Sequence, residues 1–235
     1  MCGRYVGAMP AVDLAEMFGV SGELPNHEPN WNVAPTNRMP VIRRHPETGQ
    51  RRLDLLTWGL VPHFTKDLKA ARKPINARAE TAASTGMFRG ALARRRCIVP
   101  ADLFYEWKAE ADGKQPFAVG RHDRRPFALG GLWESWVQPD GTLLRSYAII
   151  TTAANVDMAG LHVRMPLVLE EADWPAWMDG DASEAAALMR PAPAGTLRIW
   201  AVSRAVNSVR NQGPALIEPV PDGAGAAPAG GPNSA

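Results

Sequence analysis

The chain is punctuated by short runs of β-branched, aliphatic and aromatic residues, and these runs constrain its fold more than any other feature. They occupy residues 39–43, 53–58, 97–99, 104–108, 116–119, 127–133, 146–151 and 197–202. Short apolar runs bounded by turn-forming residues are typical of strands. Asp112-Gly113 and Asp140-Gly141 each lie between two neighbouring runs, and Asp-Gly supplies the positive φ angles of a tight hairpin turn. The pattern therefore predicts antiparallel pairing of successive strands.

Helical patterns are fewer, and they do not alternate regularly with the strands. We expect helices at 11–18, 80–95, 171–178 and 183–190, with Ser183 as the N-cap of the last. A parallel sheet with crossover helices is not favoured, because that architecture needs regular alternation. The sequence predicts an α+β fold, in which a single domain has a curled, mainly antiparallel, barrel-like β core flanked by short helices.

The composition fits one globular domain followed by a disordered end. Of the 235 residues, 46% are hydrophobic, which is enough to bury a sizeable core without disulfides or a metal. We expect the domain to span 1–218, and the Pro-, Gly- and Ala-rich segment 219–235 to be a disordered tail. No segment approaches the ~20 apolar residues of a membrane span, and none resembles a signal peptide. We therefore expect a cytoplasmic monomer with no membrane association, no cofactor and no metal site.

The cationic residues are unusual in kind rather than in number. The formal net charge is only +2, but 21 of the 26 cationic residues are Arg. The planar guanidinium suits phosphate groups and stacks on bases, which favours nucleic-acid binding. A bias towards GC-rich codons explains the same excess, since Ala, Gly and Pro are also abundant. Composition alone leaves both explanations open.

The two cysteines differ in their setting, and two are too few for a secreted disulfide framework. Cys97 lies in an apolar run and is expected to be a small buried hydrophobic residue. Cys2 directly follows Met1. Because a small second residue favours removal of the initiator methionine, we expect the mature chain to begin with a free cysteine.

An unblocked N-terminal cysteine carries two nucleophiles on adjacent carbons. Its α-amino group has a pKa near ~7.8, so it is neutral far more often at pH 7 than a lysine side chain. The amine can condense with an aldehyde, and the thiol can then attack the imine carbon to close a five-membered thiazolidine. Because the second attack is intramolecular, the ring should outlast a simple Schiff base. This chemistry requires Cys2 to be accessible, in a pocket that admits an aldehyde.

Seven separate motifs resemble those of one known family. They are MCGRY at 1–5, NVAPT at 32–36, WGLVP at 58–62, INARAET at 75–81, FYEWK at 104–108, LHVRMP at 161–166 and VSRAV at 202–206. In their order they resemble the SRAP family, the SOS response-associated peptidases. The resemblance implies a sensor of abasic sites in single-stranded DNA, which forms a covalent thiazolidine through Cys2 and shields the lesion in the DNA damage response. It also implies a self-processing, thiol-peptidase-like activity, of the hydrolase or lyase class, that removes the residue ahead of the cysteine.

Three further residues join Cys2 as expected catalytic residues. Asn76 is expected to hydrogen-bond the terminal amine or the sugar and hold the nucleophile in line. Glu106 lies in an aromatic strand, where alternation places it on the face opposite its aromatic neighbours, and is expected to shuttle protons. His162 is expected to donate or accept a proton, since imidazole titrates near neutral pH. A turn-forming Asn, a solvated Glu and a structural His are the alternatives.

Five residues are expected to bind DNA, namely Arg4, Phe64, Arg78, Thr151 and Arg164. The three arginines flank motif residues, as expected if phosphates are clamped around a reacting sugar, although each taken alone could be a surface charge. Phe64 follows the motif at 58–62, at a place where family members often carry Trp, and is expected to stack on a base. Thr151 matches a family position near the DNA.

Two other functions would use the same residues. One is an N-terminal-cysteine hydrolase acting on peptide or amide bonds, with Cys2 as nucleophile and His162 or Glu106 as base. The other is a non-covalent single-strand binder, in which Cys2 is incidental and binding falls steeply with salt. A crosslinker is consumed at one equivalent, whereas a hydrolase turns over. A protein that binds DNA would also be nucleoid-associated within the cytoplasm.

Overall fold

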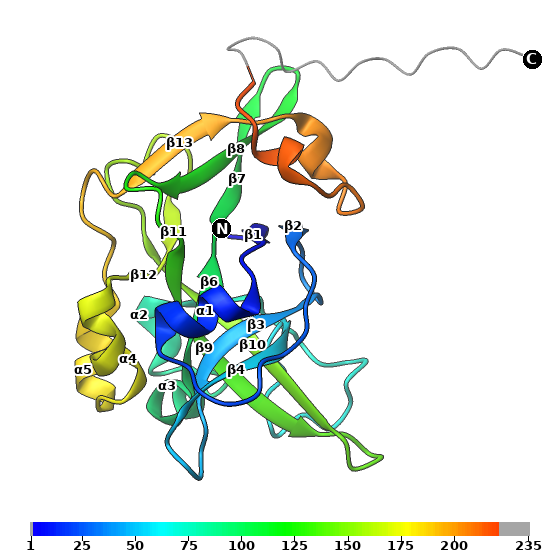
Figure 1. Ribbon diagram of the computed structural model, residues 1–235, viewed down its shortest axis with the longest axis vertical. Coiled ribbons are helices and arrows are strands. Elements are labelled where there is room, and N and C mark those ends of the chain that lie inside the picture. The colour runs from blue at the N-terminus through cyan, green and yellow to red at the C-terminus, as the bar shows by residue number, and fades with distance from the viewer. Residues whose placement is uncertain (1, 221–235) are drawn as a thin grey trace, which may run out of the picture.

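Two β-sheets form the body of the protein, and the computed structural model describes residues 2–220 (Figure 1). The larger sheet has eight strands, which are β3 (Arg38–Arg44), β4 (Arg51–Trp58), β5 (Asn76–Arg78), β6 (Arg96–Ala101), β9 (Phe127–Val137), β10 (Leu143–Ala153), β11 (Arg164–Pro166) and β12 (Val168–Leu169). The smaller sheet has five, which are β1 (Tyr5–Gly7), β2 (Asn30–Val33), β7 (Leu103–Glu110), β8 (Gly113–Arg121) and β13 (Leu197–Ala201). Each run predicted from the sequence coincides with one of these strands to within a few residues.

The larger sheet closes into a five-stranded barrel. Its central order is β10-β4-β3-β6-β9, and β9 also pairs with β10, which returns the sheet to its first strand. All the barrel pairs are antiparallel except β10–β4, which is parallel. The predicted mainly antiparallel, barrel-like core is therefore confirmed. Beyond the barrel, the last residues of β10 pair with β5 on one edge and β11 on the other.

Both Asp-Gly hairpins form as predicted. Gly113 has a φ of 127° between β7 and β8, and Gly141 has a φ of 84° between β9 and β10. These positive φ angles are the conformations that glycine adopts without steric cost. The second hairpin belongs to the barrel and the first to the smaller sheet, which lies above the barrel in Figure 1.

The helices are short, and one predicted helix is wrong. α1 (Ala11–Phe18) has the predicted bounds. The continuous helix expected at 80–95 is instead divided into α2 (Ala79–Ala82) and α3 (Arg89–Arg94). The segment between them contains Ser84, Thr85 and Gly86, which favour turns over helix because of their local hydrogen bonds and backbone freedom. No helix among residues 2–220 is long and apolar enough to cross a membrane.

The two helical segments near residue 180 need smaller corrections. The segment predicted at 171–178 consists of a 3-10 turn (Glu171–Asp173) followed by α4 (Trp174–Met178). α5 (Ala182–Leu188) is capped by Asp181 rather than by Ser183. The Asp181 carboxylate accepts the backbone N–H groups of Ser183 and Glu184 at 2.7 and 2.9 Å, and a carboxylate is also favoured by the helix dipole at this end.

The described chain extends two residues past the predicted domain boundary at 218. Pro219 forms an isolated bridge with Val202, and the N–H of Val220 donates to the carbonyl oxygen of Ala201 at 3.0 Å. The rest of the predicted tail, residues 221–235, lies outside the described residues, as does Met1.

The main apolar core brings together side chains from the barrel and from the smaller sheet. It contains both cysteines together with Tyr5, Trp58 and Tyr147. A second core lies between the barrel strands and the helices, and a third packs on the smaller sheet. The main core therefore connects the N-terminal strand β1 with the barrel strands.

Candidate active site

Cys2 lies at the start of the smaller sheet, just before β1. The first strand pairs with both β2 and β7, so the N-terminal residues are carried into the protein rather than left on its surface. The side-chain amide of Asn76, at the start of β5, donates a hydrogen bond to the carbonyl oxygen of Cys2 at 2.9 Å. Two segments that are distant in sequence thus meet at the second residue of the chain.

Glu106 is the acidic side chain whose charge acts on Cys2. It lies on β7 and is only 6% exposed. Strand alternation places it on the face that Phe104 presents to the main core, while Tyr105 and Trp107 pack in the third cluster. Burial raises the pKa of the Cys2 thiol to about 12, and the negative charge of Glu106 contributes to the rise. The thiol is therefore protonated at neutral pH, beside a carboxylate.

The expectation of an accessible Cys2 is wrong for the chain as described, because the residue is only 1% exposed. The reason is that Cys2 packs in the main core with Tyr5 and Trp58. The full sequence places Met1 directly ahead of it. The packing around Cys2 must therefore open before this thiol can react.

Aromatic side chains lie beside Cys2 and hold the Asn76 strand. The hydroxyl groups of Tyr5 and Tyr147 are 2.6 Å apart in the core, and Tyr147 stacks on Trp58 with ring centroids 6.4 Å apart. The indole N–H of Trp58 donates to the carbonyl oxygen of Ile75 at 2.9 Å. This bond fixes the backbone immediately before Asn76, so the aromatic group positions the amide that contacts Cys2.

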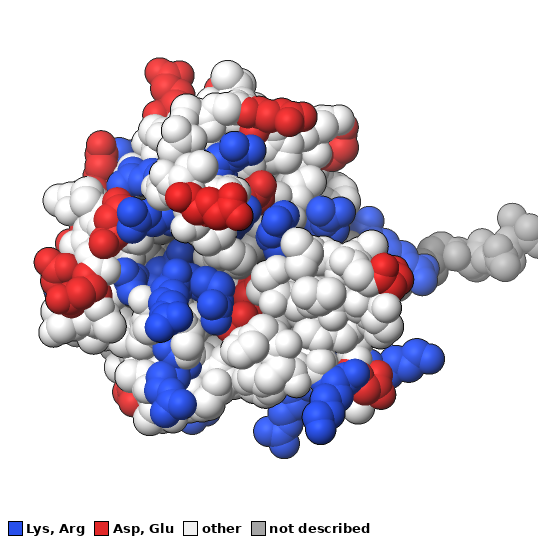
Figure 2. All heavy atoms as spheres, turned by 90° about the horizontal axis from the view of Figure 1, so that it is seen from below, with Lys and Arg blue, Asp and Glu red and all other residues white. Residues whose placement is uncertain are grey.

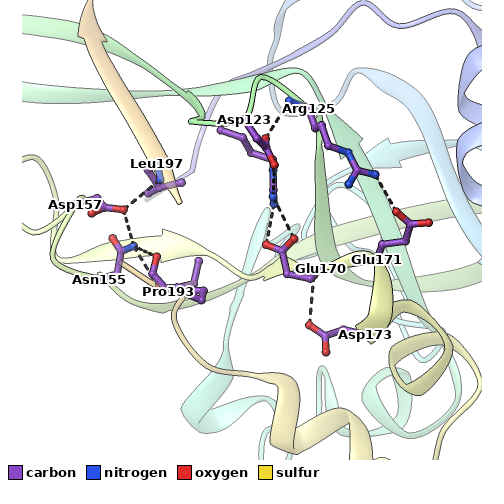
Figure 3. Close-up of polar contacts among 11 residues, drawn as sticks. Asp123, Arg125, Asn155, Asp157, Glu170, Glu171, Asp173, Pro193 and Leu197 are labelled. Atoms are coloured by element: carbon purple, nitrogen blue, oxygen red, sulfur yellow. Dashed lines mark hydrogen bonds and ion pairs between the residues drawn. The ribbon is translucent and has the colours of Figure 1, made fainter. Parts of the chain in front are cut away.

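His162 lies on the loop that enters β11, and the first part of this loop is anchored to a distant segment. Asn155 donates to the carbonyl oxygen of Pro193 at 3.1 Å, and Asp157 accepts the N–H of Leu197 at 3.1 Å (Figure 3). The N–H of His162 itself donates to the carbonyl oxygen of Met158 at 3.0 Å. The loop is therefore tied to the start of β13 before it presents the imidazole.

The imidazole of His162 is held through its Nδ1 atom. The backbone N–H nitrogen of Arg164 lies 2.9 Å from Nδ1, and the carbonyl oxygen of Arg164 lies 3.2 Å from the same atom. The backbone of Arg164 therefore fixes the ring at the start of β11. His162 precedes β11, which pairs with the same end of β10 that pairs with β5. Strand β10 therefore brings the Asn76 and His162 segments to one end of the sheet.

Arg4 is held by contacts within the protein. Its guanidinium donates to Oδ1 of Asn32 at 2.7 Å and to the carbonyl oxygen of Val206 at 3.0 Å. It also lies 5.6 Å from the centre of the Trp107 ring. The three motifs at 1–5, 32–36 and 202–206 therefore meet at this arginine.

Arg164 forms a two-pronged pair with Glu80, with N···O distances of 2.5 and 2.9 Å. It also donates to the carbonyl oxygen of Thr151 at 2.6 Å. The hydrogen bonds from Arg164 hold the pKa of Glu80 below its usual range. Thr151 is fully buried. Arg78 is exposed and lies opposite Thr151 in the β5–β10 register. A direct contact between Thr151 and DNA remains a prediction.

Phe64 lies at the surface of the protein. It is 57% exposed on the loop after 58–62, and its ring meets that of His63 edge to face at 5.3 Å. The indole of Trp136 donates to the carbonyl oxygen of Thr65 at 2.7 Å and anchors this loop. Phe64 is therefore an aromatic ring with a free face on a fixed loop.

The sequence analysis missed four residues that build this site, although motifs contained two of them. Trp58 and Glu80 lie in quoted motifs, but their roles depend on contacts with distant segments. Tyr147 and Asn155 lie outside every motif, and only the folded structure brings them to Tyr5 and to the segment around 192–193. No local pattern signals such long-range bonds.

Fold and site together define a small β-barrel protein whose second residue is a buried cysteine, which accepts a hydrogen bond from an amide and is affected by the charge of a nearby carboxylate. A family model for SOS response associated peptidases (SRAP) matches residues 1–209. The chain therefore belongs to the SRAP family, as the motifs indicated.

Curated relatives cover nearly the whole chain. It is 38% identical over 224 residues to the abasic site processing protein YoqW of Bacillus subtilis, a match that covers 93% of this chain and 99% of the relative. It is 34% identical over 232 residues to the abasic site processing protein YedK of Escherichia coli, covering 94% and 100%. The abasic site processing protein HMCES of Gallus gallus is 31% identical over 227 residues, covering 83% and 67%.

Solved structures share the fold. A crystal structure of a protein from Bacteroides thetaiotaomicron superposes with a TM-score of 0.84 at 21% identity, covering 93% of this chain and 100% of the other. A protein from Bordetella bronchiseptica superposes with a TM-score of 0.73 at 27% identity, covering 86% and 99%. The barrel with its second sheet is therefore an established architecture.

Proposed function

We propose that this protein processes abasic sites in single-stranded DNA by forming a covalent thiazolidine through Cys2. The observation that carries the proposal is the meeting of Cys2 with Asn76 and Glu106. The relatives named for abasic site processing supply the substrate, because the ring-opened sugar of an abasic site is an aldehyde. The protein acts as a shield that is consumed at one equivalent, in the cytoplasm and on the nucleoid.

The reaction begins with removal of Met1, by self-processing or by another peptidase, which frees the α-amino group of Cys2. The amine adds to the aldehyde carbon of the sugar, and loss of water gives an imine. The sulfur of Cys2 then bonds to the imine carbon, while the thiol proton leaves and the imine nitrogen gains one. The product is a thiazolidine, and no oxidant or reductant is needed.

The neighbouring residues have separate roles in these steps. Asn76 orients the nucleophile through its bond to the Cys2 carbonyl, and its Oδ1 is buried with no hydrogen-bond partner among residues 2–220. That oxygen can accept a hydrogen bond from an N–H of the freed amine. Glu106 takes the thiol proton, and His162 moves protons on and off the sugar oxygen through Nε2.

DNA is held around the site by cationic and aromatic side chains. Arg78 is exposed beside Asn76, and Arg164 and Arg4 lie at neighbouring motifs. Phe64 offers a ring on which a base can stack. Thr151 supports Arg164 through its carbonyl oxygen.

A thiol hydrolase that turns over is less well supported. Such an enzyme needs a substantial fraction of thiolate, whereas a pKa of about 12 leaves the Cys2 thiol protonated at neutral pH. An imine is activated by its own protonation, so attack by a thiol with an adjacent carboxylate suffices for ring closure.

A denaturing gel tests the proposal directly. Protein is incubated with single-stranded DNA that carries one abasic site, or with the intact strand, and then denatured. We expect a shifted band only with the abasic strand, at one equivalent of protein, and intact-mass measurement should show a reactive chain without Met1. Cys2→Ala should abolish the band.

Cys97→Ala is the matched control, because it removes the other buried thiol. It should leave the band intact. A crosslink that survives Cys2→Ala, or one that forms equally in protein that retains Met1, would refute the proposal. Catalytic release of peptide fragments without any crosslink would favour the hydrolase instead.

A further inference from the structure

A cluster of arginines lies around Arg43, near the end of β3. Arg43, on β3, is only 3% exposed and pairs with Asp54 at 2.6 Å. Its guanidinium lies 4.7 Å from the centre of the Trp133 ring. Buried between an acid and an aromatic ring, Arg43 is the fixed centre of this cluster.

Other arginines add positive charge around Arg43. Burial is the main cause that lowers the pKa of Arg43, and the charges of Arg145 and Arg52 lower it further, against the opposing effect of Asp54. No ion pair within the described residues joins Arg52 or Arg145 to an acid. The group therefore has more positive than negative charge, and an anion would relieve its repulsion.

Two hollows open onto the cluster. One of about 270 Å³ is lined by Glu23, Leu24, Pro25, Arg38, Arg52, Leu53, Asp54, Leu55 and Arg145. The other, of about 550 Å³, is lined by Arg44, His45, Pro46, Glu47, Thr48, Gly49, Arg94, Arg95 and Trp133. Arg43 links the two hollows. Its guanidinium lies over the ring of Trp133, which lines the second hollow, and it is repelled by the charges of Arg52 and Arg145, which line the first. We call the residues of both hollows, with Arg43, the arginine end.

Lys and Arg side chains gather on this side of the molecule. Figure 2 shows them grouped near the centre of the face seen from below, with acidic side chains around this group and at the margins. In Figure 1 the lower part of the molecule contains β3, β4 and α3, which supply arginines of both hollows. With a net charge of only +2 for the chain, this is a local concentration of charge.

The arginine end is separate from the proposed reaction site. The charge of Arg43 acts on the pKa of Cys97, which burial raises. Both thiols in turn contribute to raising the pKa of Tyr147, for which burial is again the main cause. None of Cys2, Asn76, Glu106 and His162 lines either hollow, so an anion bound at the arginine end does not occupy the place of the reacting sugar.

We propose that the arginine end binds the phosphate groups of a nucleic-acid strand outside the lesion. Guanidinium groups match phosphate oxygens with paired N–H donors, and arginine supplies every basic side chain here except His45. Two hollows linked by Arg43 offer more cations than one phosphate uses, and this favours a polyanion over a single small anion. The site extends the proposed function, but it does not depend on the chemistry of Cys2.

Binding of an intact single strand tests this site without crosslinking. The affinity of a labelled 30-nucleotide strand without an abasic site is measured by fluorescence anisotropy at several salt concentrations. Arg52→Gln/Arg145→Gln should raise Kd about 10-fold and reduce the slope of log Kd against log salt by ~1–2, because two phosphate contacts are lost. The control pair is Arg124→Gln/Arg190→Gln, which removes two exposed arginines that line neither hollow.

Equal effects in the two pairs would overturn the proposal, because net charge alone would then explain the loss. An unchanged Kd and slope for Arg52→Gln/Arg145→Gln would also overturn it. Crosslinking of an abasic strand at saturating DNA should stay at the wild-type level in this variant. Loss of crosslinking in the wild-type protein would instead count against the Cys2 chemistry and leave the binding result standing.

Discussion

The two cysteines share one core and one degree of burial, yet their surroundings differ. Cys2 is 1% exposed and Cys97 is fully buried, and burial raises the pKa of both thiols. Both also have a backbone carbonyl that accepts a side-chain N–H. Asn76 donates to that of Cys2 at 2.9 Å, and Trp177 donates to that of Cys97 at 2.8 Å. Burial and thiol acidity therefore do not tell the two apart.

What differs is the position in the chain and the polarity of the neighbours. Cys97 lies inside β6, which pairs with β3 on one side and β9 on the other. Cys2 precedes β1, where removal of one residue exposes an amine, and it has the carboxylate of Glu106 nearby. Under the proposed function, the thiol of Cys97 stays inert, whereas that of Cys2 becomes a reagent, because only Cys2 would have a second nucleophile and a proton acceptor available.

Replacing Glu106, the proposed proton acceptor, should have the largest effect on the crosslinking rate. Glu106→Gln should slow crosslinking by about 10²-fold at neutral pH, since the thiol proton loses its acceptor. The same change removes a charge that raises the pKa of Cys2, so the loss should shrink as pH rises from 6.5 to 9. His162→Ala should also slow the reaction. Rates come from gel time courses at saturating DNA.

Glu134→Gln is the matched control for the acid. Glu134 is a carboxylate that is 2% exposed in the barrel and pairs with Arg95 at 2.6 Å. Its replacement should leave the rate at saturating DNA unchanged. If Glu106→Gln or His162→Ala reacts at the wild-type rate, the residue concerned has no catalytic role.

A smaller effect is expected from removing the side-chain hydrogen bond to the backbone carbonyl of each cysteine, and the two variants can be compared directly. Asn76→Ala should slow crosslinking by about 10-fold, with a loss of ~1 kcal/mol in the free energy of unfolding, because it releases the backbone of a reacting residue. Trp177→Phe removes the equivalent bond to Cys97 and should cost ~1–3 kcal/mol of stability without slowing the reaction. Time courses and urea unfolding of both variants measure the pair. Equal rates in the two variants would show that Asn76 has only a structural role.

The sequence was most informative where local chemistry decides the structure. Alternating apolar runs and two Asp-Gly turns predicted the strands and hairpins correctly, because these patterns act over a few residues. The short strands β1, β2, β5, β11 and β12 were missed, since too few residues carry the pattern. The helix at 80–95 was wrong, because its Ala-rich face concealed the turn at 84–86.

In the candidate site, too, local motifs were predicted correctly, whereas contacts between distant segments were not. Motifs led to Cys2, Asn76, Glu106 and His162, but not to the burial of Cys2, which depends on how β1 pairs with β2 and β7. The pairing of Arg164 with Glu80 was also invisible, although both residues lie in motifs. Such contacts join segments far apart in the chain, and no spacing within one segment encodes them.

The smallest expected effect concerns stability at alkaline pH, where the two cysteines should again behave alike. A thiol ionises near ~8.5 in the unfolded chain, whereas burial raises the pKa of both thiols in the folded protein. The stability that each contributes is fully present below ~8.5 and is lost as pH rises towards the folded value. Above ~8.5 the unfolded state binds fewer protons, so each thiol lowers stability by up to ~1.4 kcal/mol per pH unit.

Cys97→Ala should therefore flatten the fall in stability between pH 8.5 and 10, and Cys2→Ala should do so by a similar amount. Urea unfolding at several pH values measures the slope of the free energy of unfolding against pH. Each variant is compared with itself at pH 7.5, so the stability lost to a cavity left by the substitution cancels. Tyr5 and Tyr147 add to the fall only above about pH 10, because unfolded tyrosine ionises there. A slope unchanged by Cys97→Ala would mean that this thiol ionises equally in both states, and burial would then no longer explain the shared behaviour of the two cysteines.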